Sequence, residues 1–171
     1  QGLNVLYITC EMAEEKIAER IDANLLDVPI QTLSDPLFTR QKYQNKIDVL
    51  NKKTQGKLVI KEYPTASANA NHFKSLLNEL SLKKGFKPHI IFIDYLNICA
   101  SSRYKGNIVN SYTYVKSIAE ELRGLAGEFN VPIVSATQTT RSGYGNSDVE
   151  ITDTSESFGL PATADIMFAL I

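Results

Sequence analysis

Three polar residues, Glu11, Asp94 and Gln138, each stand at or just past the end of a short apolar run. One carboxylate can polarise an attacking water, a second can hold a metal ion, and an amide can sense or orient a phosphate group. A hydrolase needs such groups together. If the apolar runs are parallel strands, their carboxyl ends meet at one edge of a sheet, where the three side chains could converge on one ligand. Plainer interpretations remain: Glu11 as a first-turn helix acid favoured by the macrodipole, and Gln138 as an ordinary loop amide.

Asp94 follows four consecutive large apolar residues, 90–93, of which three are β-branched. Such a short run, apolar on both faces, is typical of a strand buried in the middle of a parallel sheet. A carboxylate there is costly unless it is paired, hydrogen-bonded or holding a cation, so we expect Asp94 where the strand emerges at the carboxyl edge. An apolar strand ending in Asp is the Walker B pattern, in which the Asp helps hold magnesium. Many α/β proteins share that pattern, so alone it leaves the function open.

The elements that must position these residues alternate along the chain. We expect strands at 3–9, 57–61, 90–94, 131–136 and 166–171. We expect helices at about 13–26, from a start signal at 34–36, around 73–80, and around 115–129. The inward face of the second helix is Tyr43, Ile47 and Leu50. The polar segments 100–110 and 139–152 are expected as exposed loops. Alternating strands and helices predict an α/β fold, a mostly parallel sheet with right-handed crossovers and helices on both faces.

Composition excludes few classes. The 171 residues are 43% hydrophobic and 22% charged, which is ordinary for one soluble globular domain or a piece of one. No apolar run approaches the roughly 20 residues that span a bilayer, and no signal segment opens the chain, so we expect a cytoplasmic protein and no membrane partner. The net charge of −1 gives no global attraction for nucleic acid, so such contacts need a local patch or a ring of subunits.

The two cysteines, Cys10 and Cys99, each follow an expected strand. We interpret them as small buried side chains in a reducing compartment, because no nearby histidine completes a zinc pattern. His72 and His89 lie outside any motif and are expected at surface or hydrogen-bonded positions.

Four blocks of the sequence, in order, resemble the DnaB-type replicative DNA helicases, and some segments look most like those of T4-like bacteriophages. The blocks are Ile8-Thr9-Cys10-Glu11-Met12, Ile93-Asp94-Tyr95-Leu96, the segment 131–141 from Val131 to Arg141, and the segment 155–168 that begins Ser155-Glu156-Ser157. They span nearly the whole chain.

The resemblance implies a RecA-like P-loop NTPase core that uses ATP and Mg²⁺, assembles as a hexameric ring and moves on single-stranded DNA. Glu11 would be the general base for water attack, Asp94 would hold magnesium through water, and Gln138 would couple the γ-phosphate to a DNA-binding loop. Glu156 would take part in nucleotide coupling. A primase and a helicase loader are the partners that the resemblance implies.

Two loops would line the pore of such a ring. Arg103 and Lys105 lie in the first, and Arg141, Ser142, Gly143 and Tyr144 lie in the second. Contacts of these residues to phosphates or sugars would bind a strand without reading its sequence. For Arg103 and Lys105 the alternative is a solvated surface side chain. Arg141 keeps the spacing from Gln138 that the family shows.

The sequence also departs from the family. No Gly-Lys-Ser or Gly-Lys-Thr triplet occurs, so there is no Walker A loop, and the family's arginine finger is missing. We therefore expect residues 1–171 to be a partial RecA-like domain, truncated at both ends and lacking the P-loop strand, which does not hydrolyse ATP alone. Two alternatives stay open: a RecA-, RadA- or circadian-clock-type ATPase, and an ATPase-like domain that serves only as a binding or assembly module.

Overall fold

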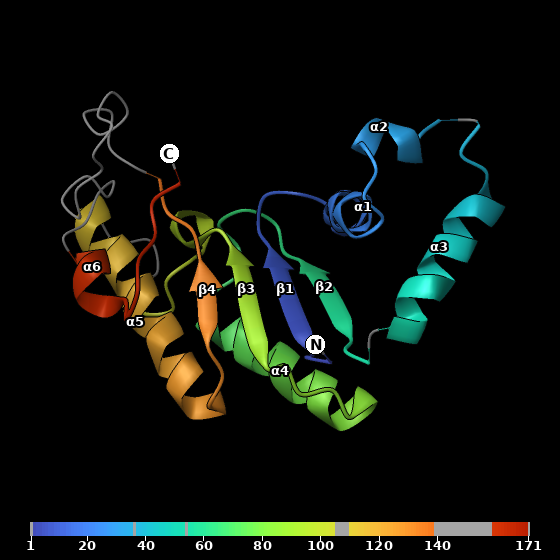
Figure 1. Ribbon diagram of the computed structural model, residues 1–171. Coiled ribbons are helices and arrows are strands. Elements are labelled where there is room, and N and C mark those ends of the chain that lie inside the picture. Colours follow the sequence, from blue (N-terminus) through green and yellow to red (C-terminus); the bar gives the residue numbers. More distant parts are fainter. Residues whose placement is uncertain (1, 36, 54, 105–109, 139–158, 171) are drawn as a thin grey trace.

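The centre of the molecule is a four-stranded, wholly parallel sheet with the strand order β2-β1-β3-β4 (Figure 1). The computed structural model describes residues 2–35, 37–53, 55–104, 110–138 and 159–170. The strands are β1 (Val5–Thr9), β2 (Leu58–Glu62), β3 (Ile90–Asp94) and β4 (Ile133–Ser135). All four were expected from the apolar runs, and β4 is shorter than its run. The predicted α/β fold with a parallel sheet is confirmed.

Seven helical segments connect and flank the strands within the described residues. They are α1 (Glu14–Leu25), α2 (Ile30–Leu33), α3 (Arg40–Lys53), α4 (Ala70–Lys84), the 3₁₀ turn η1 (Leu96–Ile98), α5 (Ser111–Phe129) and α6 (Gly159–Thr163). The helix expected to begin at 34–36 begins instead at Arg40, because Asp35 forms a turn. Its side chain accepts from the backbone N–H of Leu37 at 2.8 Å, and its carbonyl accepts from Phe38 N at 2.9 Å.

Both ends of helix α4 are set by the residues that flank it. The Asn69 side chain accepts from the backbone N–H groups of Asn71 and His72, and the His72 ring contacts the Asn69 backbone N–H in return, which forms a capping box. Gly85 ends the helix with a left-handed φ of 59°, a conformation that glycine adopts without steric cost. His72 is therefore a capping residue, and His89 accepts from Asn4 N at 2.8 Å.

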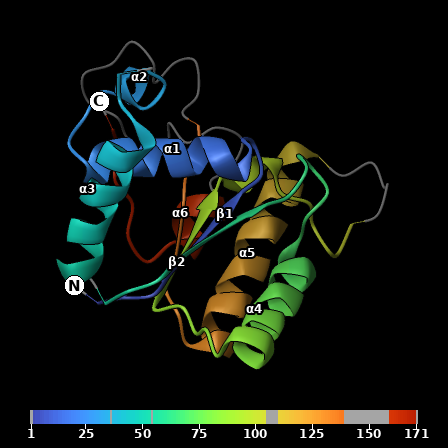
Figure 2. The ribbon, with the colours of Figure 1, turned by 90° about the vertical axis from the view of Figure 1, so that its right-hand side faces the viewer.

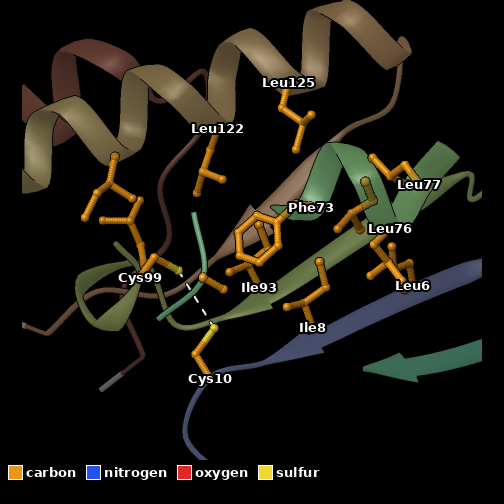
Figure 3. Close-up of a cluster of buried hydrophobic side chains, with 14 of the residues drawn as sticks. Leu6, Ile8, Cys10, Phe73, Leu76, Leu77, Ile93, Cys99, Leu122 and Leu125 are labelled. Atoms are coloured by element: carbon orange, nitrogen blue, oxygen red, sulfur yellow. Dashed lines mark hydrogen bonds between the residues drawn. The ribbon is translucent and has the colours of Figure 1, made fainter. Parts of the chain in front are cut away.

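The helices lie on both sides of the sheet. Helices α4 and α5 cover one face, and α1 and α3 lie toward the other (Figure 2). The main core sits under α4 and α5, where Leu6 and Ile8 of β1 and Ile93 of β3 meet Phe73 and Leu122 (Figure 3). Because side chains alternate along a strand, the residues between these face α1.

The face toward α1 is only partly covered by the described residues. In β3, Ile91 is 1% exposed and Ile93 2%, whereas Phe92 is half-buried. The expectation that this strand is buried on both faces is therefore correct for one face only. A cavity of about 420 Å³ opens on the other face. It is lined mainly by apolar residues: Leu3, Val5, Tyr7, Ile21, Leu25, Leu58 and Phe92.

The expected fifth strand at 166–171 is wrong over the part that the structure describes, 166–170. This segment forms no strand, and Phe168 is 88% exposed. An apolar run becomes a strand only when a neighbouring strand satisfies its backbone groups, and no described strand pairs with it. No described helix is long and apolar enough to span a membrane.

Candidate functional site

The carboxyl ends of β1, β3 and β4 lie side by side, which brings together the segments that carry Glu11, Asp94 and Gln138. Thr9, the last residue of β1, is directly opposite Asp94, the last residue of β3. Two backbone hydrogen bonds extend the pairing past the strand ends: Cys10 N to Asp94 O at 2.8 Å, and Leu96 N to Ala136 O at 3.3 Å. The parallel register thus places the three segments on one edge, as the strand assignments predicted.

Glu11 lies in a tight turn between β1 and α1, and its side chain is exposed. The hydroxyl of Thr9 holds this turn: it accepts from Met12 N at 3.0 Å and donates to Met12 O at 2.9 Å. Helix α1 starts later, with Glu14 and Glu15 as its first-turn acids. The plainer interpretation of Glu11 as a helix residue therefore does not hold, and its carboxylate has no hydrogen-bond partner among the described residues.

Glu14 has a structural role nearby. Its carboxylate accepts from Glu62 N at 2.9 Å and from Lys61 Nζ at 3.2 Å, so it ties the start of α1 to the end of β2. The bond from the Glu62 backbone is the main cause that lowers the pKa of Glu14. This carboxylate is engaged in the fold, whereas that of Glu11 is open to solvent.

Asp94 emerges at the carboxyl edge of β3, as expected, and is half-buried. Its Oδ2 accepts a hydrogen bond from the hydroxyl of Tyr7 at 2.8 Å. Burial, and then the bond to Asp94, raise the pKa of Tyr7 to about 12. Sequence reasoning missed Tyr7. The period of two puts Tyr7 and Thr9 on one face of β1, but only the register of β1 with β3 puts Asp94 on that same face.

Gln138 lies three residues past β4 and is exposed, with its side-chain Nε2 3.2 Å from the hydroxyl of Tyr95. Beside it, Thr137 Oγ1 donates to Asn97 Oδ1 at 2.8 Å. Two residues that follow Asp94 thus hold the segment that follows β4. Nothing in the sequence singled out Tyr95 or Asn97 for this task.

The first of the two expected DNA-binding loops is anchored to α5 over its described part. The Glu121 carboxylate accepts from Ser101 Oγ at 2.6 Å and from Ser102 N at 2.9 Å. Ser101 is 4% exposed and also accepts from the hydroxyl of Ser117 at 2.9 Å. Arg103 is exposed and forms an ion pair with Glu120 at 2.5 Å. This anchor was not foreseen from the sequence.

The remaining expected site residues lie outside the described residues. They are Lys105, Arg141, Ser142, Gly143, Tyr144 and Glu156.

Both cysteines are buried behind the site, 2% exposed each, with their sulfur atoms 4.0 Å apart (Figure 3). They are free thiols, and the hydrogen bond between them, together with burial, raises the pKa of Cys99. Their interpretation as buried small side chains is confirmed.

The described residues contain no cluster of three or more His, Cys, Asp or Glu side chains able to hold a metal ion. Mg²⁺ in phosphate-binding sites usually keeps several waters and is bound by one or two carboxylates together with substrate phosphates. The half-buried Asp94 places one such carboxylate at the carboxyl edge of the sheet.

Solved structures share this topology. A DnaB-like replicative helicase, solved in a study of its interactions with primase, has a TM-score of 0.73 to this chain, at 20% identity over 95% of this chain and 38% of that one. A solved ATPase domain has a TM-score of 0.74, at 20% identity over 95% of this chain and 57% of that one. The fold is thus that of the RecA-like ATPase domains of helicases.

Sequence comparison narrows the class to a family. The model of the DnaB-like helicase C-terminal domain matches residues 1–171. The DnaB-like replicative helicase of Enterobacteria phage T4 is 52% identical over 99% of this chain and 36% of its own length. A probable plasmid replicative DNA helicase of Chlamydia psittaci is 28% identical over the same shares. The chain belongs to the DnaB-like helicase C-terminal domain family, and it spans about a third of the length of these relatives.

Proposed function

We propose that this domain is the motor of a replicative DNA helicase, which couples ATP hydrolysis to movement along single-stranded DNA. The observation that carries the proposal is the convergence of the three strand ends that bear Glu11, Asp94 and Gln138 on one sheet edge. Family membership supports the same function.

The residues divide the work as follows. Glu11, exposed on a rigid turn, accepts the proton of the attacking water as general base. Asp94 would hold Mg²⁺ through a water of its hydration shell, and the ion, when bound, would supply positive charge beside the phosphates. Gln138 contacts the γ-phosphate side of the site. Because Gln138 is only three residues from Arg141, a shift of its amide is passed on to the loop proposed to bind DNA.

DNA contacts come from the two loops after β3 and β4. In this proposal Arg103 exchanges its ion pair with Glu120 for one with a DNA phosphate. Further contacts to DNA phosphates and sugars come from Lys105, Arg141, Ser142, Gly143 and Tyr144. A chain of net charge −1 attracts DNA weakly, so a hexameric ring that repeats these loops around a pore supplies the missing affinity. A primase and a loader are the partners that fit this role. Glu156 serves nucleotide coupling.

The 171-residue chain alone is proposed to lack ATPase activity. Without a Walker A loop, the backbone N–H groups and the Lys that cradle the β- and γ-phosphates are missing. Calorimetric titration of ATP into the purified chain is expected to give little or no heat. Micromolar affinity would contradict this proposal.

The motor function is tested in a longer chain, extended to the length of the relatives and carrying a Gly-Lys-Thr or Gly-Lys-Ser loop. Glu11→Gln is expected to lower DNA-stimulated ATP hydrolysis by about 10²- to 10⁴-fold, because a general base contributes that much. Nucleotide binding should be retained. The matched control is Glu15→Gln, an exposed acid four residues away in the first turn of α1. Equal activity of the two variants would rule out Glu11 as the base. Strand exchange without unwinding would favour a recombinase.

A further inference from the structure

The side chain of Tyr7 is fixed in position by its neighbours in the sheet. Tyr7 is directly opposite Phe92 in the parallel pairing of β1 with β3. The two rings stack, with centroids 6.1 Å apart and planes inclined by 21°. Both rings line the cavity on the α1 side of the sheet. The hydroxyl of Tyr7 therefore reaches along the sheet face toward the carboxyl edge.

At that edge the hydroxyl meets the carboxylate of Asp94. The Tyr7 oxygen is 2.8 Å from Asp94 Oδ2, a full-strength hydrogen bond in which the phenol donates. Within the described part of the chain, Asp94 Oδ1 has no hydrogen-bond partner. Oδ2 is thus engaged by the Tyr7 hydroxyl, while Oδ1 is left available at the carboxyl edge of the sheet.

This arrangement matters because an unconstrained carboxylate does not keep one orientation. The terminal torsion of Asp is broad, so both oxygens sample several directions. A ligand that holds an ion must keep its lone pairs aimed at it, and groups hydrogen-bonded behind the ligand usually supply that aim. In the proposed mechanism Asp94 holds Mg²⁺ only through a water, so the direction of Oδ1 must be fixed more closely.

We propose that Tyr7 is a positioning residue for the metal site, which orients Asp94 by binding Oδ2 so that Oδ1 faces the Mg²⁺-bound water. This inference rests on the proposed function of Asp94. Tyr7 itself touches neither metal nor nucleotide. Its effect is on the Mg²⁺ requirement, and a purely structural tyrosine would have none.

The test is Tyr7→Phe in the longer, ATPase-competent chain, which removes the hydroxyl and keeps the stacked ring. The matched control is Tyr43→Phe. Tyr43 also donates to a carboxylate, Asp22, at 2.5 Å, but it lies on α3, away from the carboxyl edge. We expect Tyr7→Phe to raise the half-saturating Mg²⁺ concentration for ATP hydrolysis about tenfold. The control should leave that concentration unchanged.

A second readout does not depend on turnover. Paramagnetic resonance of Mn²⁺ bound with a non-hydrolysable ATP analogue is expected to show about tenfold weaker ion binding in Tyr7→Phe. Thermal unfolding of both variants controls for folding. If Tyr7→Phe fails to fold, Phe92→Leu, which keeps the phenol but removes its stacking partner, should shift the Mg²⁺ requirement in the same direction by less. An unchanged ion requirement in the folded variant overturns the proposal.

Asp94→Asn separates this proposal from the proposed function. If Asp94→Asn abolishes Mg²⁺-dependent hydrolysis and Tyr7→Phe behaves as the wild type, only the role of Tyr7 is wrong. If Asp94→Asn keeps the wild-type Mg²⁺ dependence, Asp94 is not the metal-holding residue, and the role of Tyr7 falls with it.

Discussion

At the scale of single residues, two hydroxyl groups of β1 set the geometry of the carboxyl edge. Thr9 closes the turn that carries Glu11, and Tyr7 engages the Asp94 carboxylate. Thr9 is fully buried, with 0% of its surface exposed. Neither residue has a proposed catalytic role, yet each fixes a neighbour that has one.

Replacing Thr9 by Val should loosen that turn. Val matches Thr in shape, but the Met12 N–H and carbonyl both lose their partner, which costs about 1–3 kcal/mol when the groups stay buried. Urea unfolding of the purified protein measures the cost. Thr113→Val in α5 is the control, because the Thr113 hydroxyl makes no hydrogen bond to the described residues. Equal midpoints for the two variants would contradict the role of Thr9.

The tyrosine–carboxylate pairs predict how stability changes at alkaline pH. The pKa values of Tyr7 and Tyr43 are raised to about 12 from an ordinary 10.0. A raised pKa means that the folded state favours the protonated phenol. The stability from each pair is therefore fully present below pH 10 and is lost as the pH rises toward 12. Absorbance titration at the phenolate band should show Tyr7 and Tyr43 as late tyrosines, alongside Tyr63, whose pKa burial also raises. The Tyr7→Phe and Tyr43→Phe variants should each remove one late tyrosine. Titration of all tyrosines near pH 10 would contradict both pairs.

Residue-level sequence reasoning found the acids and the amide but not the groups that hold them. Glu11, Asp94 and Gln138 are recognisable because each follows an apolar run. Tyr7 and Asn97 become relevant only through strand register, since their partners lie 87 and 40 residues away in the sequence. Register depends on pairing between strands, which no local pattern specifies.

At the scale of elements, α5 has a second task beyond covering the sheet. Its apolar side supplies Val115, Ile118, Leu122 and Leu125 to the core, while Glu120 and Glu121 fasten the segment 101–103. The segment that follows β3 therefore leaves the sheet in a fixed direction.

Replacing Glu121 by Ala should release that segment. Ser101 is buried and loses the acceptor of its hydroxyl, so the free energy of unfolding should fall by about 1–3 kcal/mol. In the longer chain we also expect weaker binding of single-stranded DNA, measured by fluorescence anisotropy. The control is Glu128→Ala on the same helix, whose ion pair with Lys74 is exposed and contributes about 0–1 kcal/mol. Identical DNA binding by both variants would show that the Glu121 anchor does not influence the loop proposed to bind DNA.

The helices were predictable from their apolar periodicity, although the start signal at 34–36 did not mark where α3 begins. Helix α4 (Ala70–Lys84) contains the expected segment 73–80, and the expected inward residues of α3 (Tyr43, Ile47 and Leu50) are its half-buried ones. The segment 166–170 failed for the opposite reason. Its apolar residues match a strand, but a strand is completed only by a neighbour, and the described residues supply none.

At the scale of the whole molecule, the two faces of the sheet differ in how well they are covered. One face carries the continuous core under α4 and α5, and the other holds the 420 Å³ cavity beside α1. The segment 166–170 adds exposed apolar side chains, with Phe168 88% and Leu170 101% exposed. Apolar side chains exposed together on one short segment promote association.

The double variant Phe168→Ser with Leu170→Ser should lower the self-association of the chain without changing its melting temperature. Neither side chain packs against the core, so only the intermolecular contact is lost. Light scattering across a concentration series measures the change. Leu82→Ser on α4 is the control, because Leu82 is equally exposed, at 86%, but is a single residue on a helix surface. An equal decrease in self-association for both variants would show that the 166–170 segment does not drive association.

The side-chain hydrogen bonds between Tyr95 and Gln138 and between Asn97 and Thr137 join two chain segments that are 40 or more residues apart in sequence. These links couple the two segments mechanically. A displacement of the backbone just after Asp94 also displaces Gln138, even when the ligand that causes it does not touch the Gln138 amide. In the same way, a displacement of the segment after β4 reaches the segment after β3.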